Sequence, residues 1–318
     1  MKVIEHLQKA TEPLISFELI PPKRGGDIKG LLSVLDDIMK YNPPFIDITS
    51  HAAEVFYEET ATGIKKRIKR KRPGTLGICA LIQNKYNIDA VPHVLSKGFT
   101  REETEDFLIE LNYLNIENVL AIRGDDSNYD KPIPEGKSAN RNASDLVQQI
   151  TAMNSGQYLE ESLLDAKATN FCVGVGGYPE KHFESPNLKT DIKYAKAKVE
   201  AGAAYIVTQM FFDNKYYFNY VAQCREVGIN VPIIPGLKIL TSKSHLTSIP
   251  KNFHVSLPDE LADEIFKAKP EHITEIGTNW AAKQVEELLN ANVPSVHFYI
   301  MQDSKPISLL MNKLKVFK

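Results

Sequence analysis

Short apolar runs and segments of helical periodicity alternate along the whole chain. Apolar residues fill most positions of runs such as YIVTQM and VHFYIM, which is typical of parallel strands covered on both faces. Eight such runs are predicted as strands, at residues 15–20, 45–49, 90–95, 118–123, 172–178, 205–210, 233–237 and 295–301. The spacing between these runs leaves room for a crossover helix each time.

The segments between the predicted strands carry apolar residues at helical spacing. Helices are predicted at residues 27–40, 58–70, 100–114, 144–153, 190–201, 214–227, 258–267 and 272–291. Thr100 followed by Glu103 is a capping box at one of these starts. Eight strand and helix units without a linker favour an α/β fold in which residues 1–318 form a single (β/α)8 TIM barrel. Residues 124–142 are predicted to be a long irregular loop, and loops of that length are usually functional or mobile.

The composition excludes several classes of protein. Hydrophobic residues make up 43% and charged residues 25% of the 318 residues, which excludes a disordered chain. The net charge of −2 provides no general attraction to nucleic acid or to an anionic membrane, and no apolar run is long enough to span one. Cys79, Cys172 and Cys224 are widely spaced, which disfavours a disulfide framework and structural zinc. We therefore expect a soluble, cytoplasmic protein without a metal site.

Polar residues at the carboxyl ends of barrel strands are the first candidates for chemistry. Glu18 lies in the run ISFELIPP, where apolar neighbours would desolvate its carboxylate and raise its pKa toward that of a general acid. The structural alternative is a glutamate paired with a lysine or arginine in a packed layer. The end of one predicted strand carries a base, a small residue and an acid, which are Arg123, Gly124 and Asp125. On these residues alone, a salt-bridged strand end is equally consistent.

Other motifs carry less information. His93 and His182 lie near strand ends, but a lone buried histidine is more often structural than catalytic. No HExxH or related ligand spacing is present, so no metal is expected. Residues 174–177 lack the GxGxxG spacing, so a Rossmann dinucleotide fold is not predicted. Residues 65–72 hold seven basic residues out of eight, and we interpret this run as a solvated helix end rather than a nucleic-acid signal.

A set of segments in fixed order gives the chain a recognisable pattern. They are SFELIPPK at 16–23, AVPHVL at 90–95, LAIRGDD at 120–126, NASDLV at 142–147, GYPEKH at 177–182, AGAAYIVTQMFFD at 201–213, PIIPGL at 232–237 and VHFYIM at 296–301. In this order the chain resembles the methylenetetrahydrofolate reductase family, in its short bacterial form, from about residue 12 to 310. The resemblance implies one catalytic barrel without the regulatory domain of eukaryotic members.

The resemblance also implies an activity. Members of this family are flavoproteins that take a hydride from NADH or NADPH onto FAD and pass it to methylenetetrahydrofolate. The product, methyltetrahydrofolate, belongs to one-carbon metabolism and supplies methionine biosynthesis. The nicotinamide and the folate use the same flavin face in turn, so a two-step ping-pong cycle is expected, as is a homo-oligomer.

Roles carry over to individual positions. Glu18 matches the general acid that helps to open the folate ring, and Asp125 matches an aspartate between flavin and pterin. Gln209 matches a residue that meets the pterin or the nicotinamide. The positions that match FAD contacts are Thr49, His93, Arg123, Gly124, Asp125, Ala143, Tyr178, His182, Asp191 and Lys198.

Some positions depart from the family pattern, and two other functions stay open. The departures are Asn142, Tyr194 and Ala197 near the flavin, His245 near the substrate, and Asp303 where family members carry an arginine that approaches the folate tail. One alternative is a flavin-free barrel enzyme acting on a pterin or another small molecule, and the predicted strands contain no lysine for a Schiff-base aldolase. The other is a non-catalytic barrel subunit, which the retained Glu18 and Asp125 count against.

Overall fold

The computed structural model describes residues 1–125 and 128–314, and its centre is a ring of parallel strands. In spatial order the strands are β10 (Gly236–Leu237), β11 (Ser295–Met301), β1 (Leu14–Leu19), β2 (Phe45–Ile48), β5 (Asp89–Leu95), β6 (Asn118–Ile122), β7 (Cys172–Gly177), β8 (Tyr205–Thr208) and β9 (Ile233–Ile234). Only Pro235 separates β9 from β10, so the two ends of this order are one interrupted strand and the sheet closes on itself. The predicted α/β barrel is confirmed, with its seventh strand divided into two short pieces.

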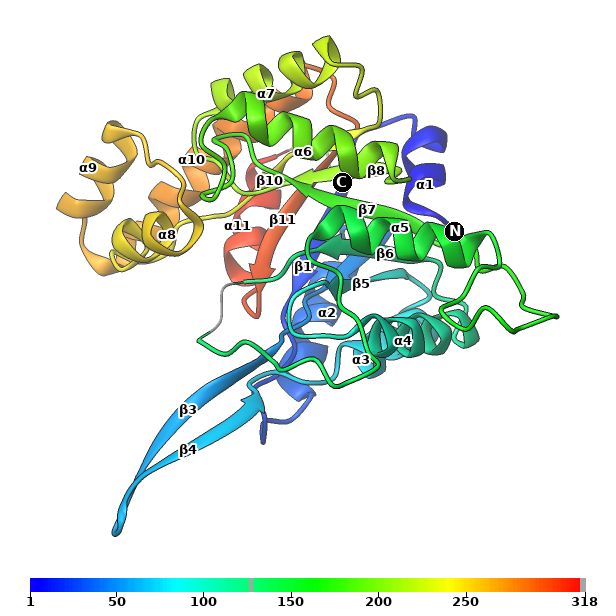
Figure 1. The fold of residues 1–318 in the computed structure, drawn as a ribbon. Helices are drawn as coiled ribbons and strands as arrows, with labels where there is room; N and C mark the ends of the chain where they lie inside the picture. Colours follow the sequence, from blue (N-terminus) through cyan, green and yellow to red (C-terminus); the bar gives the residue numbers. More distant parts are fainter. Residues whose placement is uncertain (126–127, 315–318) are drawn as a thin grey trace.

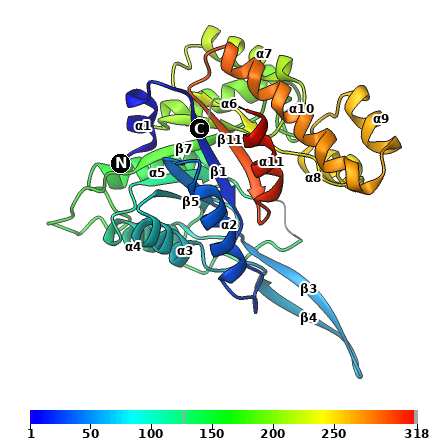
Figure 2. The same cartoon turned by 180° about the vertical axis from the view of Figure 1, so that it is seen from behind.

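Helices surround the ring (Figures 1 and 2). They are α2 (Lys29–Met39), α3 (Thr75–Leu81) with a following π-helical turn (Ile82–Tyr86), α4 (Arg101–Tyr113), α5 (Ala143–Asn154), α6 (Leu188–Glu200), α7 (Asn214–Glu226), α9 (Asp259–Lys267) and α10 (Pro270–Asn290). The capping box of α4 is confirmed, since Thr100 Oγ accepts from Glu103 N and the Glu103 carboxylate accepts from Thr100 N. Three further helices were not predicted: α1 (Val3–Lys9), α8 (His245–Phe253) and α11 (Lys305–Lys313).

Two apolar layers stabilise the barrel. The outer layer lies between the strands and the helices, whereas the inner layer fills the ring with side chains such as Phe45, Val91 and Tyr205. Gly174 admits the Tyr205 ring, because a Cβ at this position would lie 2.3 Å from that ring. Helix α1 closes the amino end of the ring: Val3 is fully buried, and its amide donates to Asn118 Oδ1 at 2.8 Å.

The predicted helix at 58–70 is wrong, because these residues belong to a β-hairpin. Strands β3 (Ala53–Thr60) and β4 (Gly63–Arg70) pair antiparallel and project from the barrel (Figure 1). Glutamate and lysine favour helices, but a two-residue turn ending at Gly63, with a φ of +132°, reverses the chain here. The basic run is therefore one exposed hairpin strand and the loop that follows it, and it does not end a helix.

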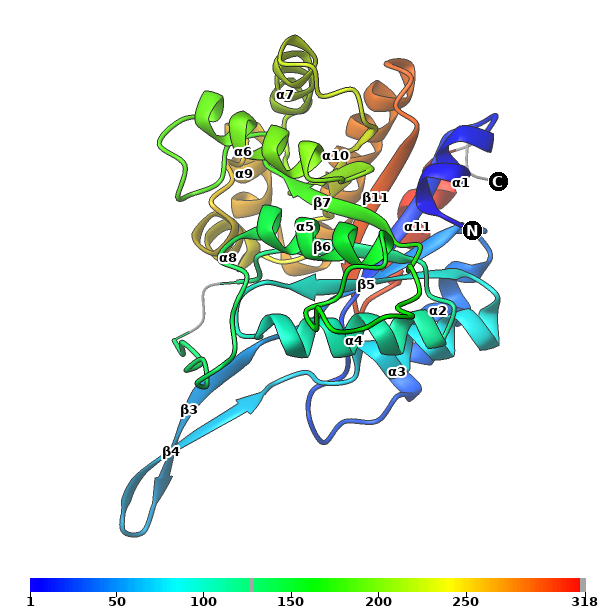
Figure 3. The ribbon, with the colours of Figure 1, turned by 45° about the vertical axis from the view of Figure 1, so that its right-hand side comes forward.

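The loops at the carboxyl ends of the strands form the mouth of the barrel. The hairpin follows β2, and Figure 3 shows it leaving the molecule at the end toward which β5 and β7 run. Helices α8 and α9 form a lobe beside this end, and the Glu180 carboxylate accepts from Ser256 N of that lobe at 2.9 Å. The described part of residues 124–142 contains no helix or strand, as predicted, and Asp126 lies outside the described residues. Among the described residues, no helix is both long and apolar enough to cross a membrane.

Candidate active site at the mouth of the barrel

Glu18 lies near the end of β1 with only 7% of its surface exposed. Register pairs it with Asp47 on β2 and with Tyr299 on β11, so three polar residues of adjacent strands share one layer. His93 on β5 brings its Nε2 to 3.4 Å from a Glu18 carboxylate oxygen and to 3.8 Å from Asp47 Oδ1. The parallel strands thus place two acids and a histidine inside the ring just below its mouth.

Burial governs the protonation of this cluster. Desolvation raises the pKa of Glu18 to about 7, and the negative charges of Asp47 and Asp125 act in the same direction, against His93 and Lys238. Burial alone would lower the pKa of His93, but the carboxylates of Asp47 and Glu18 outweigh it and raise that pKa above its ordinary value. Glu18 therefore retains a proton over a large fraction of molecules at neutral pH, as a general acid must.

The buried carboxyl group predicts a measurable link between pH and stability. The folded pKa of about 7 lies above the ordinary value of 4.5, so this group's contribution to folding is complete below 4.5 and is lost as pH rises through 7. Glu18→Gln does not titrate, so its unfolding free energy relative to wild type should rise by about 3 kcal/mol between pH 4.5 and pH 9. Urea unfolding of both proteins at several pH values measures this difference. A difference independent of pH would mean that Glu18 is ionised in the folded protein.

Aromatic and charged residues gather on the opposite side of the mouth, after β6 and β7. The rings of Tyr178 and His182 meet edge to face with centroids 4.7 Å apart, and Lys198 Nζ on α6 lies 5.8 Å from the centroid of the Tyr178 ring. Arg123 Nη1 donates to Glu184 at 2.8 Å, and Ser185 Oγ donates to Asp191 Oδ1 at 2.8 Å. Five of the positions matched to FAD contacts are thus brought together: Arg123, Tyr178, His182, Asp191 and Lys198.

A cavity beside these residues is lined by groups that suit the diphosphate of a dinucleotide cofactor. It has a volume of about 310 Å³, and its lining includes Ser96, Lys97, Arg123, Asn140 and Arg141. Ser96 Oγ is buried and has no hydrogen-bond partner among the described residues, a cost that a ligand would remove. Phosphate oxygens accept hydrogen bonds from cationic side chains and from hydroxyl groups. The lining offers both, so the residues present fit the diphosphate of a cofactor such as FAD.

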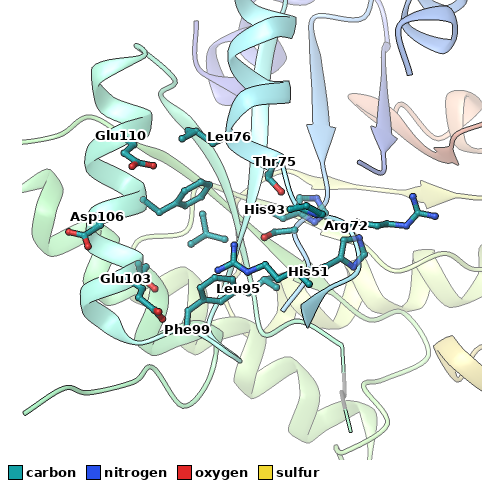
Figure 4. Close-up of a pocket in the computed structure, with 17 residues that line it drawn as sticks. His51, Arg72, Thr75, Leu76, His93, Leu95, Phe99, Glu103, Asp106 and Glu110 are labelled. Atoms are coloured by element: carbon teal, nitrogen blue, oxygen red, sulfur yellow. The ribbon is translucent and has the colours of Figure 1, made fainter. Parts of the chain in front are cut away.

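A second cavity, of about 360 Å³, extends from the mouth between α3 and α4. Figure 4 shows His51, Thr75 and His93 at its centre, Arg72 on one side, and acidic residues of α4 on the other. Thr49 lies beside it: the Thr49 hydroxyl is 3.1 Å from His51 Nε2, and the Thr49 carbonyl accepts from Thr75 Oγ at 2.9 Å.

The structure also gives the positions of the four remaining predicted site residues, Gly124, Asp125, Ala143 and Gln209. Gly124, with a φ of +92°, packs against Leu95, and the exposed Asp125 follows it within electrostatic reach of Glu18. Ala143 begins α5 directly after Asn142, whose side chain caps that helix. Gln209 follows β8, where its Oε1 accepts from Met210 N at 2.9 Å. Among the described residues, no hydrogen bond or ion pair joins Ala143 or Gln209 to the Glu18 cluster.

Two charged residues of the site were missed by the sequence analysis. Asp47 is 1% exposed, and neither of its carboxylate oxygens has a hydrogen-bond partner in the described chain. An acid inside the apolar run FIDIT was the available signal, equal in kind to Glu18 in ISFELIPP. Lys238 follows β10 and donates to the Tyr299 carbonyl at 3.0 Å, and burial lowers its pKa. Its position one residue after a predicted strand gave no comparable signal.

Within residues 1–125 and 128–314, no group of three or more histidine, cysteine, aspartate or glutamate side chains is arranged to hold a metal ion.

Comparison with known proteins assigns the family. The chain matches the family model described as methylenetetrahydrofolate reductase over residues 2–315. It is 29% identical over 327 residues to methylenetetrahydrofolate reductase (NADH) 1 of Arabidopsis thaliana, covering 98% of this chain and 50% of that protein. It is 29% identical over 298 residues to 5,10-methylenetetrahydrofolate reductase of Buchnera aphidicola, covering 91% of this chain and 87% of that protein. The chain spans about half the length of the plant and yeast relatives that it matches.

A solved structure supports the fold. An uncharacterized protein from Clostridium thermocellum that binds two copies of 5-methyl-5,6,7,8-tetrahydrofolic acid aligns with a TM-score of 0.56 at 11% identity. The alignment covers 97% of this chain and 98% of that one, and it shows a shared barrel fold. Together with the family model that spans nearly all of its residues, the comparisons show that this chain belongs to the methylenetetrahydrofolate reductase family.

Proposed function

We propose that this barrel reduces 5,10-methylenetetrahydrofolate to 5-methyltetrahydrofolate with NADH or NADPH through bound FAD. The observation that carries the proposal is the buried Glu18 carboxyl group, whose pKa of about 7 lets it hold a proton beside the mouth. The family membership and the names of the relatives support the reaction, and some of those names include NADH or NADPH. We further propose that residues 1–318 act as one catalytic domain.

We propose that the flavin lies on the side of the mouth formed by β2, β5, β6 and β7. Arg123 and the cavity lined by Ser96 and Arg141 would hold its diphosphate, whereas Tyr178 and His182 offer aromatic surface. The resemblance implies further contacts with FAD, which complete the proposed set: Thr49, His93, Gly124, Ala143, Asp191 and Lys198. When bound, FAD supplies two-electron hydride transfer, accepting from the nicotinamide and donating to the folate.

The chain's own residues supply proton transfer and orientation. Glu18 gives its proton to the folate amine that leaves when the five-membered ring opens, which produces a reactive iminium on the folate. His93, at 3.4 Å, and Lys238 stabilise the Glu18 carboxylate that remains. Asp125 places a negative charge at the mouth, suited to a cationic folate, and Gln209 is proposed to orient the pterin or the nicotinamide.

Steady-state turnover tests the proposal. The purified protein is given methylenetetrahydrofolate with NADH or with NADPH, and the folate product is identified by chromatography. We expect 5-methyltetrahydrofolate, with parallel lines in double-reciprocal plots because the two substrates occupy one site in turn. Consumption of neither nicotinamide, with flavin supplied, would refute the reductase and leave a flavin-free enzyme or a non-catalytic barrel.

A further inference from the structure

Asp47 lies inside the ring of strands, on the strand next to Glu18, with only 1% of its surface exposed. Neither of its carboxylate oxygens has a hydrogen-bond partner within the described residues. Two histidine rings flank it: His93 Nε2 is 3.8 Å from Oδ1, and His297 Nδ1 is 4.0 Å from Oδ2. A buried carboxylate without hydrogen bonds is costly, which points to a use for its charge.

The two histidines differ in their partners. His297 Nδ1 lies 2.9 Å from Ser16 Oγ, and burial lowers the pKa of His297, so this ring is neutral near pH 7. His93 Nε2 is buried, has no hydrogen-bond partner in the described chain, and faces Asp47 and, at 3.4 Å, Glu18. Burial opposes a charge on His93, but the two acids outweigh it and raise its pKa. His93 is therefore the cationic member of the cluster.

The other titratable groups around the cluster leave this pairing in place. Asp125 and His51 face His93 from the loops after β6 and β2. Lys238 faces Glu18, but its Nζ donates to a main-chain carbonyl. Three groups that face Asp47 are kept neutral because burial raises the pKa of each: Cys79, Tyr205 and Tyr299. Among the described residues within 4.0 Å of the Asp47 carboxylate, the cation is thus His93.

A route to solvent ends at the His93 ring. His93 lines the 360 Å³ cavity between α3 and α4 (Figure 4). The α4 wall of this cavity includes Asp106 and Glu110, which are exposed, so the cavity reaches solvent. The ring therefore lies between a path for water and the Glu18 carboxyl group. A histidine in such a position can take up a proton from water and pass it on.

The proposed reaction consumes a proton in addition to a hydride. NADH or NADPH supplies the hydride, whereas the folate amine takes its proton from Glu18, which is left as a carboxylate. Glu18 must regain a proton before it can act again. With 7% of its surface exposed it has little direct access to bulk water, whereas His93 Nε2 is 3.4 Å away.

We propose that His93 returns a proton to Glu18 after each turnover, and that Asp47 is the positioning residue whose negative charge holds that proton on His93 until Glu18 needs it. This inference rests on the proposed function, because it assumes that Glu18 is the acid. In the return step the His93 Nε2–H bond breaks and the Glu18 O–H bond forms. The neutral ring then takes up a proton from solvent through the cavity, so each turnover moves one proton from water to the folate.

The pH profile of turnover tests the role of Asp47. Asp47→Asn removes the charge with little change of shape, and Asp89→Asn is the matched control, because Asp89 begins the same strand as His93 but binds His6 and the amino terminus at the opposite end of the barrel. Without the charge of Asp47, both His93 and Glu18 lose their protons more readily. The decline of turnover with rising pH should therefore begin about one pH unit lower than in wild type.

The loss in Asp47→Asn should thus depend on pH. Turnover should be about 10-fold below wild type at about pH 8 and equal to it at about pH 5.5, since a shift of one pKa unit changes the protonated fraction tenfold. Asp89→Asn should keep the wild-type profile. An Asp47→Asn profile that does not move, or a loss that is the same at every pH, overturns the proposal, because the latter is the behaviour of a merely structural residue.

His93→Gln tests the proton carrier itself. The first turnover uses the proton already on Glu18, so later turnovers should slow at least about 10-fold more than the first in rapid-mixing experiments. Added imidazole, which is small enough for the 360 Å³ cavity, should restore the later turnovers. If the first and later turnovers slow equally and imidazole restores neither, His93 does not carry the proton.

Histidine NMR provides a readout that does not depend on turnover. The ring signal of His93, assigned by its absence from His93→Gln, is titrated in wild type, Asp47→Asn and Asp89→Asn. We expect its midpoint to fall by about one pH unit in Asp47→Asn alone. If folate turnover is absent but this midpoint falls, the proposed function fails and the pairing of Asp47 with His93 stands. An unchanged midpoint in Asp47→Asn overturns the inference even if the protein reduces the folate.

Discussion

Replacing Glu18 with glutamine should lower the rate of methylenetetrahydrofolate reduction by about 10²–10⁴-fold, the usual contribution of a general acid. Glutamine keeps the shape of the side chain but has no proton to give at the pH where Glu18 titrates. Reduction of the flavin by NADH or NADPH requires no such proton, so that half-reaction should proceed near the wild-type rate. In wild type, the folate half-reaction should slow as pH rises above about 7, since the acid form of Glu18 disappears there.

Rapid mixing under anaerobic conditions separates the two half-reactions. Glu180→Gln is the matched control, because burial also raises the pKa of Glu180 at this end of the barrel while its carboxylate contacts only the α8–α9 lobe in the described structure. We expect this control to reduce the folate normally. A Glu18→Gln variant with an unchanged folate rate would exclude Glu18 as the acid, and one that also loses reduction by nicotinamide would place Glu18 in a general structural role.

Replacing Gly277 with alanine should destabilise the protein by about 2–4 kcal/mol. An alanine in the middle of a helix ordinarily stabilises it by up to about 1 kcal/mol relative to glycine. Here the added Cβ would lie 2.0 Å from the carbonyl oxygen of Leu240, so α10 and the segment after β10 would have to move apart. The clash involves main-chain atoms, and no side-chain rotation can relieve it.

Urea unfolding measures this effect, with Trp280 as a probe on the same helix. Trp280 is the only tryptophan, and its Nε1 donates to the Phe212 carbonyl at 2.8 Å. The control is Gly30→Ala in α2, where an added Cβ meets no atom within 4 Å and stability should stay within about 1 kcal/mol of wild type. Equal stability of the two variants would show that α10 does not approach Leu240 as closely as described.

The strands were predictable because burial on both faces leaves a plain signal in the sequence. Runs such as YIVTQM are mostly apolar, and they lie where β8 and its neighbours form. The hairpin was not predictable from the same reasoning, since the residues from 58 to 70 are nearly all exposed and no core imposes a pattern on them. Their pairing depends on the local turn at Gly63, which the helix-favouring lysines and glutamates concealed.

The site was predictable in part. Glu18 drew attention because an acid in an apolar strand is costly, and the structure places it beside His93 as one cluster. Asp47 carried the same signal and became recognisable as part of the site only when the register set it opposite Glu18. Lys238 belongs to the site through a contact between segments far apart in the chain, its hydrogen bond to the Tyr299 carbonyl. Periodicity within one segment contains no information about such contacts.

The visible absorption spectrum of the purified protein tests the central claim most directly. We predict flavin absorption from bound FAD that bleaches on anaerobic addition of NADH or NADPH and returns on addition of methylenetetrahydrofolate. A colourless protein that takes up no FAD on reconstitution would contradict the account. The buried Glu18 and the cation-lined cavity beside Arg123 would then belong to a different chemistry.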